Sequence, residues 1–363
     1  MPSIYLLLFF LIIFVINLYF LIWVYSSVQK IKNNPLPKNQ VLRNYSIILA
    51  AHNEQENVSK CLDVLINQDY PESQYEIIIV ADRCEDNTAE IVENYKNQFE
   101  RLSVISILDL PDGISPKKNA LNKGIEAAMF EHLLFVDADV IPTTHLISSI
   151  NSCFNDKVAV VVGLMKLNVQ SSFFHRFLIY ERLLNWSVAV GGIGNNTPII
   201  AYGGCWAYTK SSFNQVGGFD KILHSMGGDD DLLLQQFGKA NVNVVFCKDP
   251  NGWVRTDAPM TFSDFLRQRK RHIAAGKYYQ TKFKIGYFLF HGSNLLFWLL
   301  PFINPWAIVF LLLKMFFILG LIHQAKGLFK EKISLKFIPL FEFLFVLYNL
   351  LLGVTGHLGE KRW

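Results

Sequence analysis

The sequence predicts an α/β protein in which a mostly parallel sheet is flanked by helices, with apolar helices before and after it. Between residues 45 and 275, short β-branched runs alternate with helical patterns, which is typical of strand–helix–strand units. Long apolar stretches with few charges precede and follow this region, and each approaches the ~20 residues needed to cross a bilayer. The chain is 51% hydrophobic and 18% charged, so it is less charged than an ordinary soluble domain.

The first apolar stretch is predicted to be a retained membrane anchor over residues 1–29. This stretch contains no charged side chain, and residues 4–24 are almost wholly aliphatic and aromatic. A cleaved signal peptide would have a positively charged start and a shorter apolar run. A stiff, proline-containing linker follows over residues 30–44 and is basic at Lys30, Lys32, Lys38 and Arg43. The positive-inside rule therefore places the next domain in the cytoplasm.

From residue 45 the pattern predicts alternating strands and helices. Short runs rich in apolar residues are typical of strands covered on both faces, and they occur at 46–51, 76–81, 102–108 and 133–136. Helical patterns lie between them at 57–68, 87–99 and 118–130. Later elements are a strand at 206–208, a helix opened by residues 227–232 and a basic helix at 265–272.

Two carboxylates stand at the end of the fourth predicted strand. Asp137 and Asp139 follow the apolar run 133–136, at the strand end where open α/β sheets bind ligands. Side chains two apart in extended backbone point the same way, so both carboxylates can face one site. Hard oxygen ligands in this arrangement suit Mg²⁺ or Mn²⁺ held together with substrate phosphates.

The C-terminal part predicts three further membrane spans and a basic loop. An interfacial segment is expected at 276–285, spans at 286–303, 306–323 and 337–354, and a tail at 355–363. The loop between the last two spans carries Lys326, Lys330, Lys332 and Lys336, which favours the cytoplasmic side. If residues 286–303 lie on the membrane instead of crossing it, the C-terminus changes side, and this alternative stays open.

Charge and cysteine content limit the remaining classes. The net charge of +4 is mild, and we expect no nucleic-acid partner. Five cysteines are scattered without a Cys-x-x-Cys pair, which excludes a zinc-ribbon pattern and favours reduced thiols in a cytosolic compartment.

Seven segments in order carry a resemblance to a known family. They are AAHNE (50–54), VADRCEDNT (80–88), KKNALNKGI (117–125), DAD (137–139), GGCWAYTKSSFNQVGGFD (203–220), GGDDDL (227–232) and QRKRH (268–272). Their order and spacing resemble the membrane-bound family 2 glycosyltransferases, a group that includes the cellulose, chitin, hyaluronan and poly-N-acetylglucosamine synthases and ceramide glucosyltransferase. The resemblance implies a GT-A fold over residues 45–275 and sugar transfer from a nucleotide diphosphate.

The resemblance also implies roles for the matched residues. Donor-binding residues are expected at Asn53, Glu54, Asp82, Lys117 and Asp137, with Lys118 as a second candidate for the diphosphate. The metal ligands are expected to be Asp137 and Asp139, with Mg²⁺ or Mn²⁺ as cofactor. The general base is expected to be Asp229, with Asp230 as the main rival. Acceptor and diphosphate contacts are expected from Gln268, Arg271 and His272.

Three positions depart from the family pattern. Ala81 replaces an aspartate, Gly228 replaces a glutamate, and His272 replaces the tryptophan that closes a Gln-x-x-Arg-Trp motif. The change at Ala81 affects which contact to the donor base survives. The change at His272 favours a short acceptor over a growing polymer, because an imidazole offers a sugar ring a smaller apolar face than an indole.

We therefore expect an inverting hexosyl- or N-acetylhexosaminyl-transferase at the cytoplasmic face of the plasma (inner) membrane. It would move a sugar from a nucleotide-sugar, with a UDP-sugar favoured, to a lipid-linked or short glycan acceptor in cell-envelope polysaccharide or glycolipid synthesis. Two alternatives stay open: a processive polysaccharide synthase, and a non-catalytic membrane scaffold with a glycosyltransferase fold. A glycolipid carrier is disfavoured, since the predicted spans contain one acidic residue, Glu342.

Overall fold

The computed structural model describes residues 4–35 and 41–355 of the chain. These residues form two compact units, each treated below by itself. The sheet unit comprises residues 41–169 and 196–258, and the helical unit comprises residues 4–34, 170–195 and 259–355. Lys38 of the predicted linker and residues 356–363 of the predicted tail lie outside the described residues.

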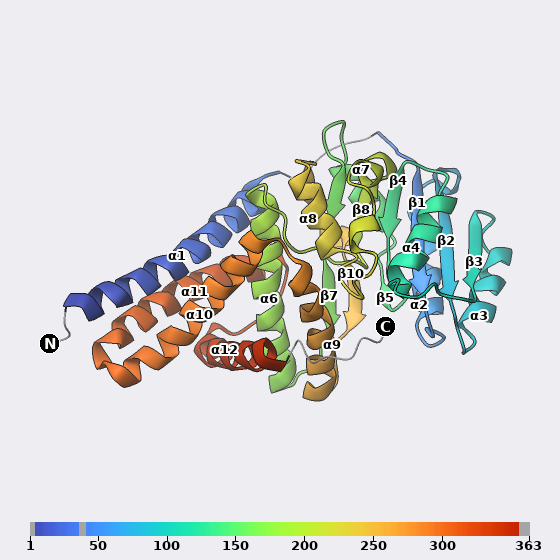
Figure 1. Cartoon of the computed structure of the whole chain (residues 1–363). Helices are drawn as coiled ribbons and strands as arrows, with labels where there is room; N and C mark the ends of the chain where they lie inside the picture. The colour runs from blue at the N-terminus through green and yellow to red at the C-terminus, as the bar shows by residue number, and fades with distance from the viewer. Residues whose placement is uncertain (1–3, 36–40, 356–363) are drawn as a thin grey trace. The chain divides into compact units, whose positions relative to one another are not determined.

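The sheet unit is built on a seven-stranded sheet in the order β3-β2-β1-β4-β8-β6-β9 (Figure 1). Its strands are β1 (Tyr45–Ala51), β2 (Tyr75–Asp82), β3 (Leu102–Ile107), β4 (His132–Phe135), β6 (Val160–Val162), β8 (Trp206–Thr209) and β9 (Val244–Phe246). Strand β8 runs antiparallel to both of its neighbours, and the other pairs are parallel. This arrangement confirms the predicted α/β class with a mostly parallel sheet.

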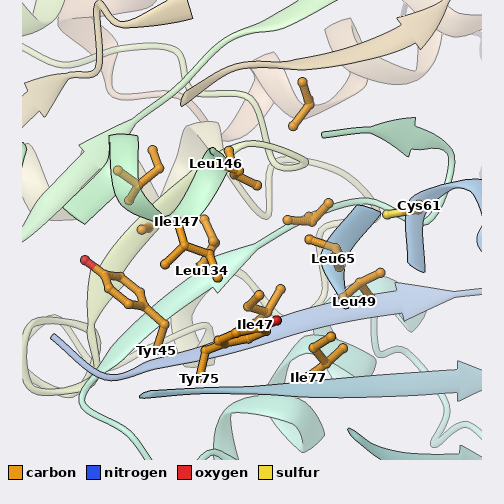
Figure 2. Packing of buried hydrophobic residues seen from close by; sticks show 14 of the residues in the cluster. Tyr45, Ile47, Leu49, Cys61, Leu65, Tyr75, Ile77, Leu134, Leu146 and Ile147 are labelled. Carbon is orange, nitrogen blue, oxygen red and sulfur yellow. The ribbon is translucent and has the colours of Figure 1, made fainter. Parts of the chain in front are cut away.

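The first two strands are mostly apolar because both faces of the sheet are covered. In β1 and β2 nearly every residue is buried, as expected for central parallel strands. Figure 2 shows side chains from both strands, including Tyr45, Ile47 and Ile77, packing with Leu65 and Leu134 in one core. The core therefore joins β1, β2 and β4 to the helix before β2, and it fixes where each strand ends.

Six α-helices belong to the sheet unit: α2 (Val58–Leu65), α3 (Thr88–Asn94), α4 (Pro116–Ala127), α5 (Leu146–Cys153), α7 (Lys210–Gln215) and α8 (Asp231–Lys239). Helix α4 begins two residues earlier than predicted, since Pro116 stands in its first turn, where proline needs no hydrogen-bond partner. Gly124 lets α4 approach the sheet, because a Cβ there would lie 2.5 Å from Ile48 Cγ2.

A second sheet, which the sequence did not predict, has three short strands in the order β5-β10-β7. They are β5 (Val140–Ile141), β7 (Met165–Asn168) and β10 (Val254–Asp257). Strand β5 follows directly on Asp139 and pairs antiparallel with β10 through Ile141 and Arg255. This pairing anchors the segment that leaves the Asp137–Asp139 region.

The helical unit contains α1 (Ile4–Asn33), α6 (Phe173–Gly194), α9 (Phe262–Ala274), α10 (Thr281–Ile303), α11 (Ile308–Leu328) and α12 (Ile338–Thr355). Helix α1 packs against α6, α10 and α11 (Figure 1). Four helices of the described chain are long and apolar enough to cross a membrane: α1, α10, α11 with the turn before it, and α12. They correspond to the four stretches predicted from the sequence, although α1 and α10 extend into the predicted linker and interfacial segments.

Polar groups inside the helical unit are paired across helices. Glu181 of α6 is fully buried and receives a hydrogen bond from Arg269 Nη2 of α9 at 2.7 Å. Asn185 Nδ2 at 2.7 Å and the Tyr348 hydroxyl of α12 at 3.3 Å also donate to this carboxylate. We call these four residues the Glu181 cluster. Breaking a buried pair of this kind by removing one charge typically costs about 3–5 kcal/mol, so the cluster ties α6, α9 and α12 together.

A second buried pair joins α11 to α12. Lys314 Nζ lies 2.5 Å from Glu342 Oε1, and each side chain is 1% exposed. The Tyr180 hydroxyl of α6 donates to the other oxygen of Glu342. Glu342, the one acidic residue in the predicted spans, is therefore neutralised within the helical unit, which accounts for its presence in an apolar helix.

Candidate active site

The paired carboxylates lie at the C-terminal end of β4, as the sequence predicts. Strand β4 pairs with β1 and β8, and Val136 continues the ladder by donating to the Ile48 carbonyl at 3.2 Å. Asp137 follows and is partly exposed, with 26% of its side chain accessible, while Asp139 is exposed. Both carboxylates thus leave the central sheet at the edge where substrates bind in folds of this class.

Lys117 connects Asp137 to the carboxylate proposed as the base. Its Nζ lies 2.9 Å from Asp137 Oδ1 and 3.2 Å from Asp229 Oδ2. Burial by itself would lower the pKa of Lys117, but the carboxylates of Asp137, Asp229 and Asp230 outweigh it and raise the pKa above its ordinary value. The ammonium group is therefore charged, and it lies in the first turn of α4, where the helix dipole favours anions.

Two adjacent glycines make room for this arrangement. A Cβ on Gly204 would lie 2.6 Å from Asp137 Oδ2, and one on Gly203 would lie 3.1 Å from Asp229 Oδ2 and 3.4 Å from Lys117 Nζ. Any side chain at Gly204 would displace the Asp137 carboxylate. The Gly-Gly pair is thus required by the close approach of backbone to the charged groups.

The three consecutive aspartates at the start of α8 have different partners. Asp230 caps the helix, since its Oδ1 accepts from Asp231 N at 2.7 Å and its Oδ2 accepts from Gly203 N at 2.9 Å. Asp231 Oδ1 accepts from Ala201 N at 2.9 Å. Asp229 instead faces Lys117. Asp230 and Asp231 therefore hold the 201–203 segment through hydrogen bonds to its backbone. Asp229 pairs with the Lys117 side chain, which favours Asp229 over Asp230 as the general base.

The acid–base states of Asp229 and Asp230 also differ. Burial by itself raises the pKa of Asp229, but the ammonium groups of Lys117 and Lys118 outweigh it and hold that pKa below its ordinary value. Burial and the Asp229 carboxylate raise the pKa of Asp230 to about 6. Asp229 is consequently ionised at neutral pH, which is the state that a general base requires.

The turn before these aspartates explains one departure from the family pattern. Gly228 has a φ of +75°, in the left-handed region where a glutamate would be strained. Lys118 supports the same turn: it is fully buried, and its Nζ donates to the Ser225 and Gly227 carbonyls. Lys118 therefore holds the turn, and these contacts direct it away from the alternative role of binding the diphosphate.

The loops after β1 and β2 are tied together beside the carboxylates. Asn53 has a φ of +56°, and its side-chain oxygen accepts from Glu85 N at 2.8 Å. Glu54 N donates to Thr88 Oγ1 at 2.7 Å, and Glu54 Oε2 accepts from Asn57. Burial and the Asp137 carboxylate raise the pKa of Glu54, which places Glu54 in the same electrostatic environment as Asp137.

Asp82 has a partner that the sequence analysis did not assign. It is fully buried, and both of its carboxylate oxygens accept from Arg83, with Nε–Oδ1 and Nη2–Oδ2 distances of 2.9 Å. Arg83 adopts a φ of +48° to make this fork. The neighbouring Ala81 is also buried. The Asp82 carboxylate, predicted to bind the donor directly, is therefore inaccessible, and Arg83 is the partly exposed member of the pair.

The residues present fit a divalent cation. Reduced solvation of the carboxylate, together with the neighbouring charges of Asp137 and Glu54, raises the pKa of Asp139 to about 6. The negative charge around Asp139 therefore exceeds what Lys117 neutralises. No three His, Cys, Asp or Glu side chains of the described residues are grouped to hold a metal ion. Mg²⁺ sites commonly use one or two carboxylates and take their other ligands from substrate phosphates and water, and Asp137 and Asp139 are two carboxylates of this kind at one strand end.

The remaining predicted site residues lie on α9 in the helical unit. Gln268 is half-buried, while Arg271 and His272 are exposed. Arg269 lies between them and points into the Glu181 cluster. The structure thus groups Glu54, Lys117, Asp137, Asp139, Asp229 and Asp230 within the sheet unit. Gln268, Arg271 and His272 belong to the helical unit.

Two family models match the chain. The model for glycosyl transferase family 2 matches residues 46–217, and the model for glycosyl transferase family group 2 matches residues 132–354. The second match covers more than half of the chain and includes the aspartates, α9 and the C-terminal apolar helices.

Several known proteins are similar to the chain. The probable glycosyltransferase YdaM of Bacillus subtilis is 25% identical over 269 residues, or 73% of this chain and 63% of that protein. The poly-beta-1,6-N-acetyl-D-glucosamine synthase of Staphylococcus epidermidis is 30% identical over 172 residues, or 44% of this chain and 40% of the synthase. The chain therefore spans less than two-thirds of the length of either relative.

One solved structure resembles the chain over nearly its whole length. It is the mannosyltransferase PcManGT from Pyrobaculum calidifontis, in complex with GDP-Man and Mn²⁺, with a TM-score of 0.58 and 15% sequence identity. The likeness covers 94% of this chain and 99% of that protein, and it shows a common fold.

Proposed function

The chain belongs to glycosyl transferase family group 2 and has the GT-A fold, and from this premise we propose that it is an inverting glycosyltransferase. It moves a sugar from a nucleotide diphosphate to a membrane-associated acceptor. The observation that carries the proposal is the Asp137–Lys117–Asp229 chain of ion pairs at the end of β4. It combines a cation for the diphosphate with an ionised carboxylate for the acceptor within one site.

In this reaction Asp229 accepts the proton of an acceptor hydroxyl while that oxygen attacks C1 of the sugar. The bond between C1 and the phosphate oxygen breaks at the same time, and the diphosphate leaves with the electron pair. Lys117 neutralises part of the charge that develops on the leaving group, and stabilisation of this kind is usually the largest contribution to the rate. A single displacement inverts the configuration at C1.

Binding of the donor is assigned to the edge formed by β1, β2 and β4. Asn53, Glu54 and Arg83, which the buried Asp82 holds in place, would face the nucleoside, and Lys117 would face the diphosphate. A divalent cation held by Asp137 and Asp139 supplies further positive charge at the diphosphate when bound. Arg271 and Gln268 are proposed to serve the diphosphate and acceptor, as their match to the family motif implies. A UDP-sugar is the favoured donor.

A screen of nucleotide-sugars tests this proposal. Purified full-length protein in detergent should gain thermal stability with its donor, and more with Mn²⁺ or Mg²⁺ present, since a ligand that binds the folded state at a hundred times its Kd stabilises it by about 2.7 kcal/mol. Release of nucleoside diphosphate from that donor should follow. Binding without any turnover would favour the alternative of a non-catalytic scaffold, which the changes at positions 81, 228 and 272 suggest.

Membrane insertion is the second part of the proposal. Helices α1, α10, α11 and α12 are taken as spans of the plasma (inner) membrane, with the sheet unit in the cytoplasm. A reporter fused after Lys38 or Lys332 should therefore be active only as a cytoplasmic reporter. A fusion at Asn304, in the turn between α10 and α11, should be active only on the opposite side. Cytoplasmic activity at Asn304, together with activity at Lys332 only on the opposite side, would show that α10 does not cross the membrane.

His272 gives a prediction for the acceptor. His272→Ala should raise the KM for the acceptor by about two- to tenfold, the equivalent of ~0.5–1.5 kcal/mol for a lost aromatic contact. The KM for the donor should change little. Arg267→Ala, which alters an exposed residue of the same helix, is the matched control and should leave both values unchanged. An equal effect on donor and acceptor would contradict the acceptor role.

The size of the product separates the two catalytic alternatives. If the imidazole at position 272 favours a short acceptor, purified enzyme with donor and acceptor should add one or a few sugars. A ladder reaching long polymer would instead identify a processive synthase, the activity named for the relative from Staphylococcus epidermidis.

A further inference from the structure

The connection between α11 and α12 contains a cavity that the proposed transferase site does not use. It has a volume of about 530 Å³ and is lined by Lys326, Gly327, Glu331, Lys332, Ile333 and Ser334. The cavity is lined by two lysines and one carboxylate, so its lining carries net positive charge.

A third lysine reaches the same place from the far end of the sequence. Lys32, near the end of α1, donates from Nζ to Gln324 Oε1 at 2.8 Å. A Cβ on Gly327 would lie 3.4 Å from Lys32 Nζ and 3.7 Å from its Cε. The absence of a side chain at Gly327 therefore leaves space beside the Lys32 ammonium group. Lys32 of α1 thus lies beside Gly327, one of the residues that line the cavity, and we call Lys32, Lys326 and Lys332 the lysine cluster.

The position of the cavity relative to the membrane follows from the helices on either side. Helix α11 ends at Leu328 and α12 begins at Ile338, and both are long and apolar enough to cross a membrane. A connection this short between two spans has to lie at the level of the lipid headgroups. This step rests on the membrane insertion that forms part of the proposed function.

We propose that the lysine cluster binds the phosphate group of an anionic phospholipid headgroup. Lysine ammonium groups act as point charges toward phosphate oxygens, and basic pockets between spans are a recurring way to hold anionic headgroups. The Ser334 hydroxyl on the rim adds a hydrogen-bond donor.

The test uses the full chain in detergent and titrates it with phosphatidylglycerol and, separately, with phosphatidylcholine. Wild type should bind phosphatidylglycerol preferentially. The triple variant Lys32→Gln, Lys326→Gln, Lys332→Gln should lose about fivefold in affinity per lysine, or about a hundredfold in all. The control is the triple variant Lys277→Gln, Lys282→Gln, Lys284→Gln, which removes the same charge near the start of α10 and should lose no more than a few-fold.

Two further arms keep the test decisive. Lys326→Arg with Lys332→Arg preserves the charge and should retain binding, which separates a binding defect from misfolding. Inorganic phosphate at millimolar concentration distinguishes the source of the ligand: binding of free phosphate without preference for the lipid would overturn a headgroup site. Equal losses in the two lysine triples would also overturn it, since diffuse surface charge would then explain the binding.

The result is separable from the proposed function. If carbonate extracts the chain from membranes, the membrane part of the proposed function fails. If the chain remains inserted and still turns over its donor but shows no lipid preference, only the lysine-cluster inference fails.

Discussion

Asp229→Asn is expected to lower turnover by about 10²–10⁴-fold, the usual contribution of a positioned general base, while donor binding stays within a few-fold of wild type. The amide keeps the size of the side chain but cannot accept the proton of the acceptor hydroxyl. Lys117 keeps its ion pair with Asp137, so the diphosphate site is preserved. Single-turnover assays with the donor identified by the screen, together with donor titration by calorimetry, measure both quantities.

Asp230→Asn is the matched control for Asp229. Asp230 accepts hydrogen bonds from the backbone amides of Gly203 and Asp231, and asparagine is a comparable helix cap. We expect this variant to lose some thermal stability and to retain most of its turnover. If Asp230→Asn abolishes turnover while Asp229→Asn remains active, the base has been assigned one residue too early.

Asp139→Asn is expected to abolish transfer and to remove the dependence of donor binding on Mn²⁺ or Mg²⁺. Asp139 would contribute one of the two carboxylates that the protein offers the cation, and Mg²⁺ requires near-ideal oxygen coordination. Donor titrations with and without the metal ion test the change. Asp156→Asn, at an exposed position of the same unit, is the control and should behave as wild type.

The stability of Asp139→Asn distinguishes a lost ligand from a damaged fold. The pKa of Asp139 is raised to about 6 by the protein surroundings, Asp137 and Glu54, so the folded state disfavours the ionised form at neutral pH. A neutral asparagine removes this penalty, and the melting temperature without metal should be no lower than that of wild type. Wild-type turnover with unchanged metal dependence would show that the cation site has been wrongly assigned.

The parts of the fold that the sequence predicted are those with long, uniform patterns. Strands β1 to β4 and the four long apolar helices follow from runs of apolar residues. Helix α6 was missed because it is buried on several sides and includes Glu181 and Arg182 among its buried residues, so it shows no apolar stripe. Strands β5, β6, β7, β9 and β10 have two to four residues, which is too short for a periodic pattern to emerge.

The candidate site shows the same division. The carboxylates, Lys117 and the glycine pair could be identified as motifs, because each is a local cluster of unusual residue types. The Asp82–Arg83 fork, the burial of Lys118 and the fit of Gly204 against Asp137 could not, because they depend on backbone conformation or on contacts between distant segments. The sequence therefore indicated which residues matter, and the structure shows how each one is held.

The Glu181 cluster has a consequence for how the protein is made. Glu181 and Arg269 are 88 residues apart, and Tyr348 follows Glu181 by 167 residues. At a synthesis rate of roughly 5–20 residues per second, Arg269 is synthesised about 4–18 s after Glu181. Tyr348 is synthesised after about twice that interval. During the first interval the Glu181 carboxylate lacks the positive charge of Arg269, and burying an unpaired charge in an apolar environment is costly. The helical unit consequently reaches its final packing only after the ribosome has delivered its last helix.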